Sequence, residues 1–198
     1  MSQSEQEFFN GLAKRWDDLR ADDRLKIGNL VEMVGFAIGD RVLDIGSGTG
    51  VLLPFVKQAI GEKGLITAID FAVNMINRAE EKHRHLSEIT YVVDDIMKFQ
   101  SETLFDKIVC LNFFPHVKDK KAFILRIREL LIPYGTFVIM HDLSRAAVNG
   151  IHQNSEKVKN DRLPKGPKVA EMLAAAGYEV EMVPDNDELY FIKAMKKS

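Results

Sequence analysis

The sequence predicts a doubly wound α/β fold, in which a mostly parallel sheet of seven strands is combined with an N-terminal helical cap. From Arg41 onward, short apolar runs alternate with longer segments of helical periodicity. The short runs are β-branched and apolar nearly throughout, as in parallel strands that are covered on both faces. The last two runs are joined by the turn-rich stretch PDNDE, which predicts a hairpin and an antiparallel C-terminal strand.

The predicted elements follow one another in a regular order. We expect strands at 41–45, 65–69, 89–93, 107–112, 135–140, 178–183 and 189–195. Helical patterns lie between them at 51–60, 73–85, 119–131 and 168–178. Pro54 stands early enough in its helix to be tolerated, and Gly177 is the expected C-cap of the last helix. This alternation of strand and helix is typical of a parallel α/β sheet.

The first 38 residues read as helices that cap the sheet. One apolar stripe contains Phe8, Phe9, Leu12 and Trp16, and a second contains Leu25, Ile27, Leu30, Val31 and Val34. We expect a single domain over 1–198, with the cap at 1–38 and the core at 39–198. An insert at about 144–167 begins helically and ends in a Pro/Gly-rich loop after a strand, where such folds place substrate-recognising parts.

Composition limits the function classes. The chain has 198 residues with 27 basic and 29 acidic side chains, so its net charge of −2 provides no basic field for nucleic acid or an anionic membrane. The single cysteine, Cys110, excludes an internal disulfide. No apolar run approaches the ~20 residues of a membrane span, and the polar N-terminus is unlike a signal peptide. We therefore expect a cytoplasmic monomer or homodimer that acts on a small molecule, without nucleic acid or membrane insertion.

The stretch VLDIGSGTG, residues 42–50, follows the first strand and contains three glycines at alternate positions. A dinucleotide-binding loop needs the third glycine one position later, where Val51 stands. The loop also lacks the Gly-Lys-Ser/Thr sequence of a P-loop. Both departures weaken the prediction of a phosphate-bearing ligand.

Acidic residues end the first three strands. Asp44 and Asp70 lie at the ends of the first two, and the pair Asp94–Asp95 follows the third. No Lys or Arg occurs between 42 and 56. Carboxylates at three strand ends suit S-adenosylmethionine, which offers an ammonium group, a ribose diol and an adenine amino group, and carries no phosphate. The alternative is that Asp44 and Asp70 only cap helices or turns.

Taken together, these motifs resemble a known family. VLDIGSGTG, ITAIDFAVNMINRAEEK, YVVDDIMKF, FDKIVCLNFFPHV and LLIPYGTFVIM, in this order, are similar to the successive motifs of class I S-adenosylmethionine-dependent methyltransferases. The small-molecule branch near the ubiquinone and menaquinone methyltransferases is the most similar. The resemblance extends from about Phe8 to the last strand and implies a Rossmann-like fold.

The resemblance also implies cofactor-binding roles. Asp44 would face the methionine ammonium through water, Asp70 would accept both ribose hydroxyls, and Asp95 would accept from the adenine amino group. Asp94 competes with Asp95 for that role. The other implied residues line the methionine part, flank the adenine, approach the ammonium or close over the cofactor: Gly46, Ser47, Gly48, Gly50, Phe71, Met75, Ile96, Leu111, Asn112 and Trp16. For Trp16, Phe71 and Met75, a role in the apolar core is the alternative.

Three histidines are candidate catalytic residues. His116 follows the fourth strand, His141 ends the fifth, and His152 lies in the insert. Methyl transfer is an in-line displacement at the sulfonium methyl, and many acceptors must also lose a proton, for which histidine is the commonest base. These histidines would serve as general base or substrate anchor. They could instead hold a metal with help from Asp142, or be ordinary structural histidines.

The enzyme hypothesis has two alternatives. One is a non-catalytic methyltransferase-like module that only binds the cofactor, and the other is an NAD-dependent oxidoreductase on the same fold. The intact acidic set argues against the first, and Val51 argues against the second. The basic run KDKKAFILRIR has its apolar residues at helical spacing, which favours a solvated helix face over an RNA-binding surface. Cys110 lies inside a predicted strand, so a covalent cysteine mechanism is disfavoured.

Overall fold

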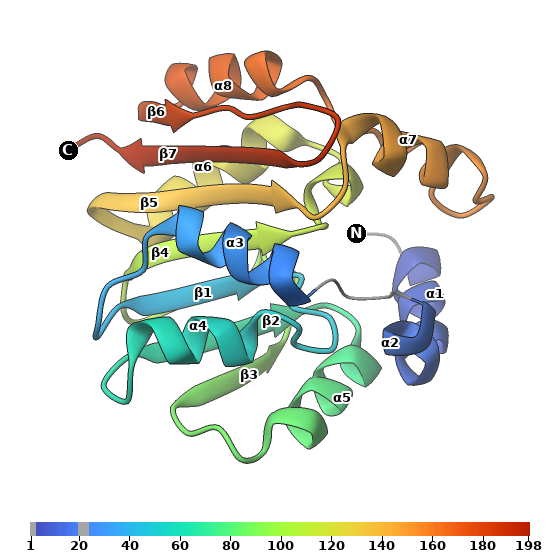
Figure 1. Ribbon diagram of the computed structural model, residues 1–198, viewed down its shortest axis with the longest axis horizontal. Coiled ribbons are helices and arrows are strands. Elements are labelled where there is room, and N and C mark those ends of the chain that lie inside the picture. Colours follow the sequence, from blue (N-terminus) through green and yellow to red (C-terminus); the bar gives the residue numbers. More distant parts are fainter. Residues whose placement is uncertain (1–2, 20–23) are drawn as a thin grey trace. The chain divides into compact units, whose positions relative to one another are not determined.

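The computed structural model describes residues 3–19 and 24–198 (Figure 1). Its seven strands form one sheet with the order β3-β2-β1-β4-β5-β7-β6. By contacts the chain divides into two compact units, Met1–Gln100 and Ser101–Ser198. The predicted doubly wound, mostly parallel sheet is confirmed. That the two units act together as a single domain, with a cap at 1–38 and a core at 39–198, stays a prediction.

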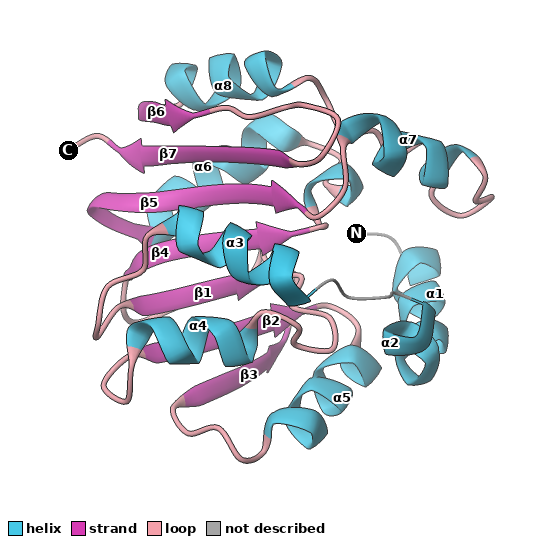
Figure 2. Cartoon of the chain, in the orientation of Figure 1, coloured by secondary structure: helices cyan, strands magenta, loops and turns pink. Residues whose placement is uncertain are grey.

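The first unit contains three parallel strands, β1 (Arg41–Ile45), β2 (Leu65–Asp70) and β3 (Ile89–Val93). β2 pairs with β1 on one side and with β3 on the other, both times in parallel. Helices α4 (Leu53–Ile60) and α5 (Val73–His83) connect the strands, and both contact β2. Parallel neighbours require such crossovers, and the alternation is visible in Figure 2.

The helical N-terminal segment comprises α1 (Gln3–Leu12), the short 3₁₀ helix η1 (Ala13–Arg15), α2 (Trp16–Leu19) and α3 (Arg24–Val34). Of the second predicted stripe, Ile27, Leu30, Val31 and Val34 are buried. Leu25 was expected with them, and this expectation is wrong, since Leu25 is 77% exposed. At about 100° per residue, Leu25 lies roughly 200° around the helix from Ile27 and so faces away from the buried stripe.

The second unit is built on β4 (Phe105–Leu111), β5 (Leu131–His141), β6 (Tyr178–Met182) and β7 (Tyr190–Lys196). β4 and β5 are parallel, whereas β7 is antiparallel to both β5 and β6, as the hairpin at PDNDE predicts. β5 begins four residues before its predicted start, because Leu131 already pairs with Phe105 at the beginning of β4. Helix α6 (Lys120–Leu130) therefore ends one residue early.

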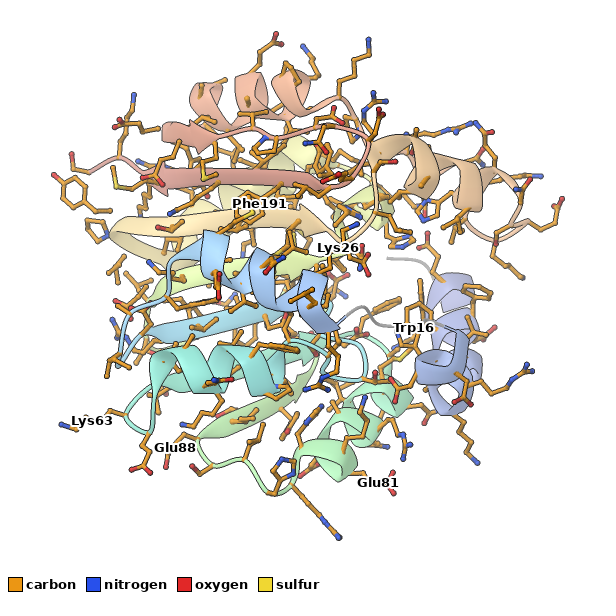
Figure 3. The ribbon with its side chains drawn as sticks, in the orientation of Figure 1. Trp16, Lys26, Lys63, Glu81, Glu88 and Phe191 are labelled. Carbon is orange, nitrogen blue, oxygen red and sulfur yellow. The ribbon has the colours of Figure 1, made fainter. Side chains whose placement is uncertain are left out.

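Helices of the second unit complete its core and carry the insert. Phe123 of α6, Phe137 of β5 and Tyr178 of β6 are buried and form successive ring contacts with centroids 6.0 and 6.3 Å apart. Phe191 of β7 is buried (Figure 3), and so is Cys110 of β4. The insert consists of α7 (Arg145–Gln153) and the loop that leads to α8 (Gly166–Ala175), which packs on β6 and β7. Within the described residues, no helix is long and apolar enough to span a membrane.

Candidate functional site

The glycine-rich loop turns sharply at the carboxyl end of β1. Gly46, Gly48 and Gly50 have φ values of 65°, 54° and 80°, in the left-handed region that favours glycine. The backbone N–H groups of Gly46 and Ser47 donate to the carbonyl oxygen of Ile69 at 2.8 and 3.1 Å. These bonds fasten the loop to the end of β2. A ligand at this edge would therefore meet bare backbone in a fixed conformation.

Asp44, the fourth residue of β1, is only 2% exposed. Within the described part of the chain, neither its Oδ2 atom nor the Oγ of Ser47 has a hydrogen-bond partner. Burial, together with the nearby charge of Asp70, raises the pKa of Asp44 to about 7. Buried polar atoms are normally satisfied, so this pair marks a place where a polar ligand fits.

Asp70, at the end of β2, binds the loop itself. Its Oδ2 accepts a hydrogen bond from Gly48 N at 3.0 Å, and its Oδ1 accepts one from Ala72 N at 2.9 Å. The turn-capping alternative is thus correct for one of its oxygens. A carboxylate has about four acceptor positions, so these two bonds do not exclude ribose hydroxyls from the same group.

The two acids after β3 shape a local turn. Asp94 Oδ1 accepts from Asp95 N at 2.7 Å, and Asp95 Oδ1 accepts from Met97 N at 3.0 Å. Ile96 between them and Met97 is buried. The role of Asp95 or Asp94 toward an adenine stays a prediction, since the structure engages both carboxylates in the turn.

Three aromatic rings and a methionine gather beside the loop within the first unit. Ala13, Ala72 and Met75 form a buried cluster against which Phe9, Trp16 and Phe71 pack. The Phe9 ring is edge-on to Trp16 and Phe71, with centroids 5.8 and 5.9 Å away. A Cβ atom placed on Gly48 would lie 3.8 Å from Nε1 of Trp16, the side chain labelled in Figure 3. Trp16, Phe71 and Met75 therefore belong to one cluster at the glycine loop, and the core and cofactor interpretations of these residues are compatible.

Polar contacts that the sequence did not reveal fasten the N-terminal helices to this site. Thr49 Oγ1 of the glycine loop donates to Asp17 Oδ1 at 2.5 Å, and Lys82 Nζ of α5 donates to Asp17 Oδ2 at 2.9 Å. Burial alone would raise the pKa of Asp17, but the bonds from Thr49 and Lys82 outweigh it and lower the pKa. Asn74 also donates two hydrogen bonds to Asn10, from its backbone N to Oδ1 at 2.9 Å and from its Nδ2 to the backbone oxygen at 3.1 Å.

The second unit contributes a separate set of residues. Asn112, directly after β4, adopts a positive φ of 57°, and its backbone N–H donates to the carbonyl oxygen of Met140 at 2.9 Å. Its buried Nδ2 has no hydrogen-bond partner within the described residues. Leu111 is buried at the end of β4. Asn112 thus holds an unsatisfied donor in a strained backbone conformation, a combination found at functional sites.

The three candidate histidines are not equivalent. The rings of His116 and His152 lie 5.0 Å apart, tilted by 34°. The ring of His141 is buried and stands edge-on against Tyr190, with centroids 5.7 Å apart. His116 follows β4 in the short 3₁₀ helix η2 (Phe114–His116), and its side chain is 12% exposed. The structure therefore pairs His116 with His152 and packs His141 against the β7 strand.

Asp161 of the insert loop, which the sequence analysis missed, organises the histidine pair. Its Oδ2 lies 2.7 Å from His116 Nδ1, and its Oδ1 accepts from Lys118 Nζ at 2.7 Å. Its backbone oxygen lies 2.9 Å from His152 Nδ1. Burial alone would raise the pKa of Asp161, but the hydrogen bonds from His116 and Lys118 lower it to about 2. His116 and Asp161 are 45 residues apart, and no periodicity of the sequence connects them.

The structure does not support the alternative that the three histidines hold a metal ion. Over residues 3–19 and 24–198, no cluster of three His, Cys, Asp or Glu side chains is placed to hold a metal ion. Asp142, the suggested fourth ligand, is a buried residue after β5.

Comparisons with known proteins agree with the fold and the motifs. Residues 42–135 match the family described as "Methyltransferase domain". A ubiquinone biosynthesis O-methyltransferase of Xanthomonas campestris is 30% identical in an alignment 148 residues long that covers 69% of this chain and 60% of that protein. A SAM-dependent methyltransferase of Aquifex aeolicus superposes with a TM-score of 0.75 at 22% identity, over 92% of this chain and 97% of that one.

A further structural neighbour was solved with a ligand. The N-methyltransferase NodS of Bradyrhizobium japonicum, in complex with S-adenosyl-L-homocysteine, has a TM-score of 0.76 at 17% identity, over 99% of this chain and all of the other. Identities this low show the fold alone. The chain spans 55–64% of the length of the ubiquinone biosynthesis O-methyltransferases that it matches, and less of the other curated relatives. The predicted resemblance is nevertheless confirmed: the chain shares the fold of solved S-adenosylmethionine-dependent methyltransferases, and residues 42–135 match a methyltransferase domain.

Proposed function

We propose that this chain binds S-adenosylmethionine at its glycine-rich loop and transfers the methyl group to a small-molecule acceptor. The observation that carries the proposal is Asp44, a carboxylate 2% exposed whose Oδ2 has no hydrogen-bond partner within the described residues. It lies near the carboxyl end of β1, and doubly wound proteins bind ligands at that end of their strands. Burying a carboxylate without a cation costs free energy, and a cationic ligand would offset that cost.

The residues of the first unit fit the parts of this cofactor. Asp44 and the Oγ of Ser47 offer acceptors for the methionine ammonium, and Asp70 holds its carboxylate beside Gly48, where ribose hydroxyls would bind. Asp95, or Asp94 in its place, would accept from the adenine amino group. Phe71, Met75 and Trp16 provide the apolar surface that an adenosine moiety needs. Structural neighbours that were solved with bound S-adenosylhomocysteine or S-adenosylmethionine support this assignment.

The protein's part in the reaction is positioning and exclusion of water. When bound, S-adenosylmethionine supplies an electrophilic methyl group, and its sulfonium sulfur is left as a neutral thioether after in-line displacement by the acceptor. The chain must hold the acceptor in line with this methyl, which is the principal source of rate acceleration in such a reaction. Leu111 ends β4 and Asn112 follows it, and His141 ends β5, so these residues lie at strand ends of the kind that carry such roles. His116 follows β4 in η2.

A small-molecule acceptor is supported by two observations. The net charge of −2 offers no field that would attract nucleic acid. The curated relatives include proteins described as O-methyltransferases of ubiquinone biosynthesis and an N-methyltransferase of coclaurine. The insert after β5 would provide the recognition surface, as insertions after strands commonly do in this fold.

Ligand binding and methyl transfer test the proposal separately. By calorimetry, S-adenosylhomocysteine should bind, and it should raise the melting temperature because it stabilises only the native state, whereas NAD should do neither. S-adenosylmethionine labelled in its methyl group, incubated with the protein and a metabolite extract, should give a labelled small molecule. Binding without transfer would indicate a cofactor-binding module, and binding of NAD instead would indicate an oxidoreductase.

A further inference from the structure

The second unit divides its charges unevenly between two regions. Residues 118–121 together with 145–168 contain nine basic and three acidic side chains, whereas the rest of Ser101–Ser198 contains six basic and ten acidic ones. The net charge of −2 for the whole chain therefore conceals a local excess of positive charge. This excess lies on the insert, which continues from the end of β5 through α7 (Figure 1), and on the turn into α6.

Asp161 joins these two basic segments. Its Oδ2 lies 2.7 Å from Nδ1 of His116, and its Oδ1 accepts a hydrogen bond from Nζ of Lys118 at 2.7 Å. The rings of His116 and His152 lie 5.0 Å apart, so α7 belongs to the same cluster. Both oxygens of Asp161 are engaged by these donors, and the charge of Lys118 offsets its own. The basic residues of 118–121 and 145–168 thus form one surface, which we call the insert cation surface.

Fewer than half of the nine cations of this surface are balanced by an acid. Four form ion pairs with carboxylates of the second unit: Lys118, Arg145, Lys159 and Lys168. The other five form no ion pair with any residue that the structure describes: Lys120, Lys121, Lys157, Arg162 and Lys165. Water solvates an exposed lysine at little cost, so the informative cations are those that the protein holds in place.

Lys120 is a half-buried cation that has no carboxylate partner among the described residues. Its ammonium donates to the carbonyl oxygen of Val117 at 2.7 Å and lies 5.4 Å from the centre of the Phe114 ring. Burial is the largest effect on its pKa and lowers it, while the charge of Asp161 opposes this and that of Lys118 adds to it. These contacts fix the ammonium but leave its charge uncompensated. An anion bound beside it would offset the lost hydration.

Arg162 provides a planar group directly after Asp161. Its guanidinium faces the side-chain amide of Gln153, which is a neutral partner. Burial is the main cause that lowers the pKa of His152, and the charge of Arg162 lowers it further, which places Arg162 close to the histidine pair. A guanidinium has five N–H donors in a fork that matches a carboxylate or a phosphate, and Gln153 can engage only part of them.

We propose that the insert cation surface binds an anionic group of the methyl acceptor, a carboxylate or a phosphate, with Arg162 and Lys120 as its main ligands. That the ligand is the methyl acceptor rests on the proposed function, whereas the binding of an anion concerns the second unit alone. Asp161 organises the surface, because it holds the side chains of Lys118 and His116 in place.

A small anion fits this surface better than a polymer does. Surfaces for nucleic acid contact a track of phosphates, and those for single strands also present exposed aromatic rings. Among the described residues of the second unit, the one exposed aromatic ring is Tyr134, near the beginning of β5, whereas the insert follows the end of that strand. The acid-rich remainder of the unit would also repel a long polyanion.

Binding is tested first without turnover, by amide ¹H–¹⁵N spectra of the full chain at constant ionic strength. Benzoate and phenyl phosphate should each shift the amides of residues 116–120 and 160–163 in a saturable way. The tighter of the two identifies the anionic group as a carboxylate or a phosphate. Benzamide, the neutral analogue of benzoate, should cause no such shifts. Shifts that do not saturate, or equal shifts with benzamide, would overturn the proposal.

Substitutions locate the site. Arg162→Gln and Lys120→Gln should each weaken binding of the tighter probe by about 5- to 10-fold, because each removes a charged hydrogen bond. Lys159→Gln is the matched control: it removes the same charge from the same loop, but that charge is already paired with Glu156 at 3.2 Å. Because Arg162 is exposed, its variant decides the matter even if Lys120→Gln, which loses the bond to Val117, does not fold. Equal weakening in Arg162→Gln and Lys159→Gln would contradict the assigned site.

Two larger probes distinguish a small anion from a macromolecule. An RNA oligonucleotide and vesicles of anionic phospholipid should not bind at about 0.15 M salt, where exposed charges are screened beyond roughly 8 Å. If either binds under these conditions and displaces the small probe, the surface serves a polyanion or a membrane and the proposal is wrong.

The assignment to the acceptor is tested with S-adenosylmethionine labelled in its methyl group. A metabolite extract is first divided on an anion exchanger, and label should enter compounds of the retained, anionic fraction. With that acceptor, Arg162→Gln should raise KM by about 5- to 10-fold and leave kcat within about twofold, because the contact is equal in the ground and transition states. Label only in the neutral fraction would overturn the assignment while the methyltransferase function stands. No label in either fraction would contradict the proposed function itself, and the spectra would still decide whether the anion site exists.

Discussion

Two buried aspartates, one in each compact unit, have opposite electrostatic environments. Asp44 beside the glycine loop and Asp161 in the insert are both almost completely buried. The pKa of Asp44 is raised to about 7 by burial and by Asp70, whereas the pKa of Asp161 is lowered to about 2 by the donors His116 and Lys118. Burial alone therefore does not determine how such a group is used.

The difference follows from what each carboxylate faces. Asp44 faces another acid, Asp70, and its Oδ2 lacks a hydrogen-bond partner within the described residues. A cationic ligand would balance this charge. Asp161 has its hydrogen-bond donors, His116 and Lys118, built into the protein, and so it can orient the neighbouring histidine. A ligand site and a positioning site can thus be distinguished by whether the charge is balanced before the ligand binds.

Gly50→Ala should have the largest effect, because it strains the glycine-rich loop that lies next to Asp44. A Cβ atom at Gly50 would lie 2.7 Å from Leu53 Cδ1 and 2.9 Å from His83 Cδ2, at a φ of 80°. Strain and overpacking together should lower the free energy of unfolding by about 2–5 kcal/mol, measured by urea denaturation. Gly39→Ala is the matched control, since its φ is 88° with nothing within 4 Å of the added atom. Equal losses in the two variants would show that the clash does not contribute.

Asp70→Ala should have the next largest effect, on the ligand rather than on folding. It removes the acceptor of Gly48 N and Ala72 N together with the group proposed for the ribose hydroxyls. Binding of S-adenosylhomocysteine should weaken by about 1.5–3 kcal/mol, the value of a charged hydrogen bond, as measured by calorimetry. Asp161→Asn should leave this affinity nearly unchanged. Unaltered affinity in Asp70→Ala would remove the ribose assignment and with it the functional contrast between the two units.

The sequence predicted the Asp44 site but not the Asp161 contacts, and this difference has a physical cause. The strands at 41–45 and 89–93 were predicted to the residue, and Asp44, Asp70 and the glycines were predicted together because each lies at a strand end that the apolar pattern defines. Asp161 lies in an irregular loop, where no periodicity fixes the direction of a side chain. Its pairing with His116 across 45 residues depends on the three-dimensional path of the insert. The Asp17–Thr49 bond was missed for the same reason, since it joins segments 32 residues apart.

A smaller effect should appear in the pH dependence of cofactor binding. The pKa of Asp44 is about 7 without ligand, and a bound ammonium group would lower it, so binding releases a proton at neutral pH. Affinity for S-adenosylhomocysteine should therefore fall as the pH drops below about 7, by up to about tenfold per pH unit, and should level off above it. Asp44→Asn should abolish the slope. Asp161→Asn should retain it, because Asp161 is already ionised throughout this range; a slope that persists in Asp44→Asn would assign the proton to another group.

The smallest predicted effect concerns how firmly the N-terminal helices cover the Asp44 site. Asp17 joins α2 to Thr49 of the glycine loop and to Lys82 of α5, and the side chains of the Asp17–Lys82 pair are about one-quarter to one-third exposed. A partly exposed ion pair of this kind contributes about 0.5–1 kcal/mol and is screened by salt. In Asp17→Asn, backbone amides of α1 and α2 should exchange hydrogen a few times faster, whereas those of β1 should not change. Asp18→Asn removes the same charge at the neighbouring, exposed position. If both variants exchanged equally fast, the helices would be held by the aromatic cluster of Phe9, Trp16 and Phe71, and the Asp17 contact would add nothing to it.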